Sequence, residues 1–247
     1  MGARPAGMGY ASSVVADETA LFNNPGALGY TDKSASFFAF ESRPSLPGAS
    51  RMAAGASWVS KFGVAGFGIF RFGDDLYREQ IASVGFGNKF GIASLGAKVN
   101  YIQYSAEAFG TKQALTLSFG GLAKITPQIL AGAYIVNLNQ ASISPDERLP
   151  TKLVAGMGFI LNEQFFITTE VEKDIDYKAT WRSGAEYTIR KKVFVRTGFN
   201  LNPMAASFGL GTKSKQLKID CALAFNKVLG PAYQTSATYQ FERRTRK

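Results

Sequence analysis

Short segments of alternating apolar and polar residues fill the chain from about Lys33 to its end. In residues 193–201, Val193 and Phe199 share one face while Arg196 and Asn200 share the other. Successive side chains of a β-strand point to opposite faces, so this period predicts strands and not helices. We count 14 such segments, each bounded by turn residues, at 34–41, 51–60, 64–72, 80–88, 92–104, 113–123, 128–139, 151–162, 164–173, 179–190, 192–201, 205–213, 216–226 and 232–242.

The connections between these segments alternate in length along the chain. Tight turns such as SKFG, NKFG and RKK are followed by longer connections of about 6 to 13 residues, such as ESRPSLPGASR and NQASISPDERLPT. Short turns at one end and longer loops at the other are typical of outer-membrane barrels with an even number of antiparallel strands. The pattern predicts an all-β fold, a 14-stranded antiparallel transmembrane β-barrel over residues 34–242, followed by a basic tail at 243–247.

The polar faces of the later segments carry charges that a soluble core would bury at high cost but that a wet lumen tolerates. The hairpin at 173–179 is expected to place Glu172 opposite Arg182, and the turn at 190–192 to place Glu186 opposite Arg196, so that opposite charges pair across strands. The predicted lumen charge network comprises Glu170, Glu172, Arg182, Glu186, Arg196, Lys218 and Asp220.

The apolar faces are then expected to point to lipid. They often end in aromatic residues, as the interface girdles of membrane barrels do: Tyr101, Phe119, Phe159, Trp181, Tyr187, Tyr239 and Phe241. Cys221 is in phase with Ile219 and Leu223. Cys221, Tyr239 and Phe241 are therefore predicted to face lipid.

The opening stretch, residues 2–30, is rich in Gly and Ala and lacks the alternation. Helical spacing in SSVVADETALF predicts a short helix, capped by Ser12 or Ser13 and running through Phe22, before Pro25 turns the chain. Glycine-rich strand faces leave room for a segment inside the barrel. We expect a hatch over residues 1–33, with an ordinary N-terminal tail or a leading amphipathic helix as the alternatives.

Four short motifs in this stretch resemble the N-terminal segment of FadL-like outer-membrane barrels, and most closely the PorV/PorQ branch. They are Gly2-Ala3-Arg4, Gly7-Met8-Gly9, Ala16-Asp17-Glu18 and Asn24-Pro25-Gly26-Ala27-Leu28, the last with the usual Ala-Gly order reversed. The resemblance implies 14 strands, an N-terminal segment folded into the barrel and an outer-membrane location. The hatch residues that it implies are Gly2, Arg4, Gly7, Met8, Gly9, Asp17, Asn23, Asn24 and Pro25.

The same resemblance implies a function. The PorV/PorQ branch is tied to type IX secretion and surface attachment in Bacteroidota, which implies a plugged accessory barrel docked on other outer-membrane or periplasmic proteins, in contact with lipid or lipopolysaccharide. The short loops favour this reading. The alternative is a FadL-like transporter of small hydrophobic molecules. Because the strand count is even, both termini are expected on one side, the periplasm.

Composition narrows the remaining classes of function. The chain has no His and one Cys, which removes His-based catalysis and Cys-rich metal sites. We therefore expect no enzyme, no catalytic residues, no metal and no cofactor. The net charge of +10 is spread over tight turns and the tail, so we expect no nucleic-acid partner. No charged and apolar leader precedes the first stretch, so the numbered chain is expected to be cytosolic or already processed.

Overall fold

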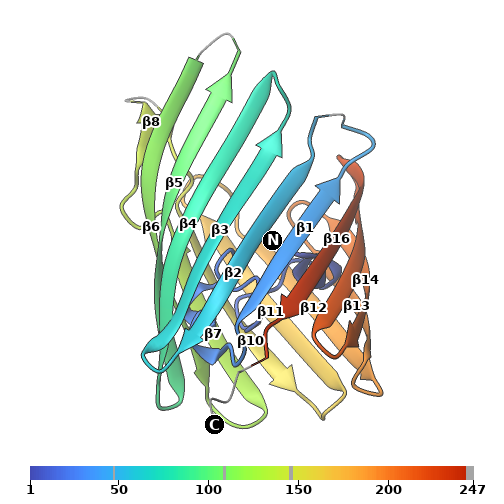
Figure 1. Cartoon of the computed structure of the whole chain (residues 1–247). Helices are drawn as coiled ribbons and strands as arrows, with labels where there is room; N and C mark the ends of the chain where they lie inside the picture. Colours follow the sequence, from blue (N-terminus) through green and yellow to red (C-terminus); the bar gives the residue numbers. More distant parts are fainter. Residues whose placement is uncertain (47, 108–109, 145–146, 243–247) are drawn as a thin grey trace.

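The computed structural model describes residues 1–46, 48–107, 110–144 and 147–242. Strands form a closed ring, and the N-terminus lies within it (Figure 1). The helical elements are α1 (Ala3–Gly7) and the 3-10 helix η1 (Pro25–Tyr30). The strands are β1 (Ala35–Ser42), β2 (Arg51–Ser60), β3 (Gly63–Gly73), β4 (Tyr77–Phe90), β5 (Ala93–Ala106), β6 (Gly110–Lys124), β7 (Ile129–Val136), β8 (Ser142–Ser144), β9 (Glu147–Arg148), β10 (Lys152–Ile160), β11 (Phe165–Asp174), β12 (Thr180–Ile189), β13 (Val193–Asn200), β14 (Ala205–Ser214), β15 (Leu217–Asn226) and β16 (Gly230–Gln240).

Fourteen of these strands pair in chain order to form the barrel, and β1 closes it against β16. The closing register runs from Ala35 opposite Gln240 to Ser42 opposite Tyr233. The small β8–β9 hairpin lies outside the ring, in the connection between β7 and β10. The predicted 14-stranded antiparallel barrel, with its first and last strands paired, is confirmed. The tail expected at 243–247 lies outside the described residues.

Each strand sorts its residues between lumen and exterior. In β16, Gln234, Ser236 and Thr238 are buried, whereas Tyr233 and Tyr239 are exposed. Polar residues thus face inward and apolar residues outward, the reverse of a water-soluble barrel and the arrangement that suits a lipid-facing wall. Among the described residues, no helix is both long and apolar enough to cross a membrane.

The strands extend further at the long-loop end than the sequence predicts. Strands β4, β5 and β6 have 14, 14 and 15 residues, whereas about 9–11 residues cross a bilayer. The predicted bounds 80–88 and 92–104 were therefore too short at this end, since β4 begins at Tyr77 and β5 continues to Ala106. Paired side chains stabilise the extension: Tyr77 stacks at an angle against Tyr104, and Ser105 and Thr111 share a 2.8 Å hydrogen bond. These strands rise above their neighbours in Figure 1.

The helix predicted between Ser12 or Ser13 and Phe22 is absent from the structure, which has turns there. Two sets of hydrogen bonds compete with this helix. The backbone N–H groups of Ser12 and Ser13 donate to Glu170 on the barrel wall. The Asp17 side chain accepts hydrogen bonds from both the N–H and the hydroxyl of Thr19, the kind of local bond that stabilises turns over helix.

Candidate functional site

The N-terminal residues cross the lumen from one wall to the other. We call residues 1–33 the hatch segment. Its helix α1 contacts β13, β14, β15 and β16, and η1 contacts β3 to β7 on the opposite side. Nearly every residue from Gly2 to Leu28 is buried, although most of this segment consists of turns and irregular backbone. The dark-blue trace in Figure 1 lies within the ring of strands.

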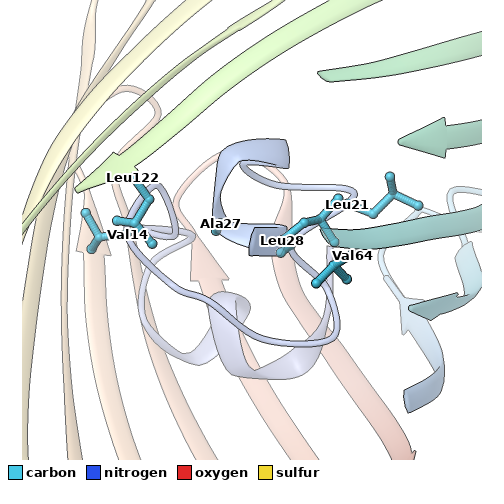
Figure 2. Packing of buried hydrophobic residues seen from close by; sticks show 7 residues of the cluster. Val14, Leu21, Ala27, Leu28, Val64 and Leu122 are labelled. Carbon is cyan, nitrogen blue, oxygen red and sulfur yellow. The ribbon is translucent and has the colours of Figure 1, made fainter. Parts of the chain in front are cut away.

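Apolar side chains of the hatch segment pack against the barrel wall in one buried cluster. Val14, Leu21 and Leu28 are each about 2% exposed or less and pack with Val64 of β3 and Leu122 of β6. Figure 2 shows these side chains between the hatch loops and the surrounding strands. Burial of an aliphatic side chain contributes roughly 1.5–3 kcal/mol. The cluster therefore stabilises the seated position of the segment.

Glycines of the wall allow the hatch backbone to approach closely. A Cβ added at Gly184 or Gly198 would collide with the backbone of Met8, and one at Gly96 would collide with the Pro25 carbonyl group. Two predicted hatch residues, Gly7 and Gly9, also lie against the backbone of the wall. A Cβ added at Gly7 would collide with Gly209 of β14, and one added at Gly9 would collide with Phe199 of β13. Backbone-to-backbone contact of this kind leaves little space for water around the segment.

Asn24 ties the second half of the hatch segment to itself and to β6. Its side-chain amide donates to the carbonyl oxygens of Ser13 at 2.6 Å and Gly121 at 3.0 Å. Its side-chain oxygen accepts from the N–H of Gly26 at 2.9 Å and so caps η1, with Pro25 at the first helical position. This explains why Asn-Pro stands at this place. Asn23 is held inside the segment by Thr19, at 2.9 Å.

A chain of alternating charges begins and ends in the hatch segment and runs along the wall between. Arg4 contacts Asp17 at 3.3 Å and Glu186 of β12 at 2.8 Å. Arg196 of β13 lies 2.5 Å from Glu186 and 2.7 Å from Asp220 of β15. Lys218 continues from Asp220 at 3.4 Å to Glu18 at 3.3 Å. In order, the members of this charge chain are Asp17, Arg4, Glu186, Arg196, Asp220, Lys218 and Glu18.

The electrostatics of the charge chain favour ionised side chains. Burial by itself raises the pKa of the Glu18 carboxyl, but Lys218 and the Thr238 hydroxyl outweigh this and hold the pKa below its usual value. Arg196 has no exposed side-chain surface, and Asp220 almost none. Buried ions of this kind persist only when each is paired. The charge chain therefore makes the position of the hatch segment and the stability of the barrel wall depend on each other.

A second cluster anchors the middle of the hatch segment. Glu170 of β11 accepts the backbone N–H groups of Ser12 at 2.9 Å and Ser13 at 2.7 Å. Arg182 lies 3.4 Å from Glu170 and 2.8 Å from Glu172. Every predicted member of the lumen charge network thus lies on the inward face.

The two predicted cross-strand pairs had different outcomes. Glu186 opposite Arg196 is confirmed. Glu172 opposite Arg182 was wrong by two residues, because the register places Glu170 opposite Arg182 and Glu172 opposite Thr180. The turn after β11 occupies residues 175–179, which shifts the pairing, but an even shift keeps both carboxylates on the lumen face. Arg182 consequently pairs with both.

The residues predicted to face lipid lie on the exterior. Tyr239 and Phe241 are 44% and 42% exposed and stack edge to face at the end of β16. Cys221 is exposed and in register with Leu210 and Thr235 on the neighbouring strands. Of the predicted girdle aromatics, Phe159 is half-buried and the others are exposed.

Cys221 provides a test of this orientation. We expect a water-soluble maleimide to label Cys221 poorly in intact membranes, because the acyl region excludes the reagent. Labelling should become rapid after solubilisation and unfolding in denaturant. Rapid labelling in intact membranes would instead place Cys221 in contact with water.

The hatch segment divides the lumen into two cavities that share no lining residue. The loop-side cavity, of about 530 Å³, lies between the hatch side chains Tyr10 and Phe22 and the inward faces of β1–β7 and β10. The turn-side cavity, of about 300 Å³, is lined by Arg4 and Glu18 from the hatch and by Glu186, Arg196 and Lys218 from the wall, among others. In the described conformation, the hatch segment lies between these two cavities.

Several polar residues of the loop-side cavity were missed from the sequence. Glu41 of β1 accepts the Tyr10 hydroxyl at 3.0 Å and pairs with Arg43 at 3.0 Å and Arg51 at 3.6 Å. Lys98 of β5 lies on the inward face. Their inward positions follow from strand parity, since Glu41 is in phase with the buried Phe37 and Ala39, and Lys98 is in phase with the buried Asn100.

The close contact at Gly96 gives a second test. Gly96→Ala is expected to displace η1 and raise the conductance of the barrel in planar bilayers at least tenfold, because the added methyl group has no space beside Pro25. The matched control is Gly121→Ala, whose Cβ would point outward at 3.2 Å from the Leu95 side chain. The control should stay closed. Equal conductance for the two variants would show that this contact does not seat the segment.

Comparison with known proteins supports the fold. No protein-family model and no curated protein matches the chain. Among solved structures it is similar to the toluene transporter TodX of Pseudomonas putida, with a TM-score of 0.73, 13% identity and coverage of 97% of both chains. It is also similar to Omp33 of Acinetobacter baumannii (0.55, 9%, 85% of this chain and 98% of that chain) and to the KdgM porin (0.52, 11%, 84% and 99%).

At these identities the similarities establish an outer-membrane-type barrel fold. They agree with the FadL-like part of the resemblance seen in the sequence. They give no support to the PorV/PorQ branch, to type IX secretion or to an origin in Bacteroidota.

Proposed function

We propose that the chain is an outer-membrane channel for small apolar molecules, closed at rest by the hatch segment, with both termini in the periplasm. The observation that carries the proposal is that the hatch segment lies between two lumen cavities and, within the described residues, makes no backbone–backbone hydrogen bond to the barrel strands. Such a segment can shift without breaking a strand ladder of the wall. The exposed apolar exterior supports a membrane location.

The apolar part of the loop-side cavity suits the body of a small apolar molecule. Phe22, Phe70, Phe72, Ile81 and Ile102 line it. Its volume, about 530 Å³, is within the range of small-molecule sites. The similarity to TodX, described as a monoaromatic hydrocarbon channel, supports the same class of cargo. No catalytic step is needed for this role.

The proposal predicts faster entry of toluene into cells. Bacteria with a complete lipopolysaccharide layer that express the chain should take up labelled toluene several-fold faster than cells with the empty vector. Uptake of a hydrophilic solute of similar size should not change, since the hatch segment leaves no open water path. Toluene uptake at the vector rate would contradict the channel role, and a docking role would then be the better proposal.

A further inference from the structure

Lys98 is a buried cation at the floor of the loop-side cavity. It is 7% exposed and lines that cavity, and its ammonium group has no hydrogen-bond or ion-pair partner within the described part of the chain. The position of Lys98 along the barrel axis follows from the contacts of the neighbouring inward-facing residue of β5. Gly96, one inward step toward the tight turns, touches the Pro25 carbonyl of η1. Lys98 therefore lies directly above the hatch segment.

The other lysine and arginine side chains that line the cavity are already paired. Arg51 lies 3.6 Å from Glu41, and Lys152 lies 3.2 Å from Glu172. Glu79, a carboxylate in the same cavity, accepts a hydrogen bond from Tyr104 at 3.3 Å. Among the described lysine and arginine side chains that line this cavity, Lys98 alone lacks a counter-charge. A buried, unpaired ammonium group is costly, so the site favours an anion supplied by a ligand.

The neighbouring polar groups do not compete for that anion. Ser83 donates to Asn100 at 2.8 Å, and Asn100 donates to Thr116 at 3.0 Å, so these three side chains form a row that is occupied with its own hydrogen bonds. Aromatic and aliphatic side chains also line the cavity. Its rings are Tyr10, Phe22, Phe70, Phe72 and Tyr104.

We propose that the loop-side cavity is a binding site for a small aromatic carboxylate, with the carboxylate on Lys98 and the ring among the aromatic side chains. Aromatic walls favour a planar ring through offset and edge-to-face contacts, and a charge-assisted hydrogen bond to Lys98 orients it. The inference rests on the proposed channel function, for which this cavity is the entry chamber. It adds to that function a preference for aromatic molecules that carry an anionic head.

Calorimetric titration of the purified full chain tests the proposal with three probes: benzoate, benzyl alcohol and toluene. Benzoate is expected to bind at least tenfold more tightly than benzyl alcohol, which has a similar shape but no charge. Lys98→Met should lower benzoate affinity at least tenfold while leaving toluene affinity within twofold. The matched control, Lys152→Met, removes a cation from the same cavity that is already paired, and should leave benzoate affinity within twofold.

Two results would overturn the inference. One is equal affinity of the wild-type chain for benzoate and benzyl alcohol, a comparison that needs no variant to fold. The other is an equal loss of benzoate affinity in Lys98→Met and Lys152→Met. That result would indicate that the overall charge of the cavity, and not a specific contact with Lys98, attracts benzoate. Toluene uptake by cells separates the two proposals: if toluene enters but benzoate binds no better than the alcohol, only the carboxylate site fails.

Discussion

Removal of residues 2–29 is expected to turn a silent barrel into a conducting one. Wall side chains fill the interior of a barrel of about eight strands, but not of one with 14. The hatch segment occupies the remaining width from β13–β16 across to β3–β7. In planar bilayers the full-length chain should show little or no conductance, and the deletion variant at least ten times more.

The deletion must leave the barrel folded for this comparison to hold. The ring closes through β1 and β16 without the hatch segment, so circular dichroism should still show a β-sheet protein. Steady conductance by the full-length chain would contradict the account, because the two cavities would then have to be connected at rest.

Replacement of Arg196 by methionine is expected to destabilise the barrel by about 3–5 kcal/mol, the cost of removing one partner from a buried ionic group. Arg196 has no exposed side-chain surface and lies between Glu186 and Asp220. The substitution removes the cation between these two carboxylates and leaves Glu186 with Arg4, and Asp220 with Lys218, as their remaining partners. Urea titration of the chain in lipid vesicles measures the loss of unfolding free energy.

Lys191→Met serves as the control for this substitution. It breaks the 3.3 Å pair between Lys191 and Glu163 in the tight turns, where both side chains are more than 80% exposed. Solvent-exposed pairs contribute little, so this variant should unfold as the wild-type chain does. Similar urea midpoints for Arg196→Met and the wild-type chain would mean that the charge chain is not a structural element.

The barrel could be predicted from the sequence because its signal is repeated in every strand. Alternation places polar side chains inward, and it holds even where the pairing is misjudged. The error at Arg182 shows this: the expected partner was two residues away, yet Glu170 and Glu172 both face the lumen. The ends of strands β4 to β6 could not be predicted, because their polar residues at the long-loop end resemble a loop until cross-strand pairs such as Tyr77 with Ala106 are known.

The site was less predictable, because it depends on contacts between distant parts of the chain. The expected helix ending at Phe22 is lost to a hydrogen bond acceptor, Glu170, that lies more than 150 residues away. Asp17 and Arg4 were singled out by resemblance, but their link to Glu186 needs the folded barrel. Lys98 could have been predicted from the sequence, because it is a lysine at an inward position of a strand that contains Gly and Ser.

A reversible tether between α1 and the wall tests the central claim, that the hatch segment must move for molecules to pass. Helix α1 contacts β15, and Ala6 and Ala222 belong to one buried cluster. Cysteines are placed at both positions in a Cys221→Ala background, and the disulfide is formed by an added oxidant. Mass spectrometry of the purified variant verifies the bond. The account predicts toluene uptake at the empty-vector rate while the tether is oxidised, and uptake at the wild-type rate after reduction. Equal, fast uptake in both states would contradict it.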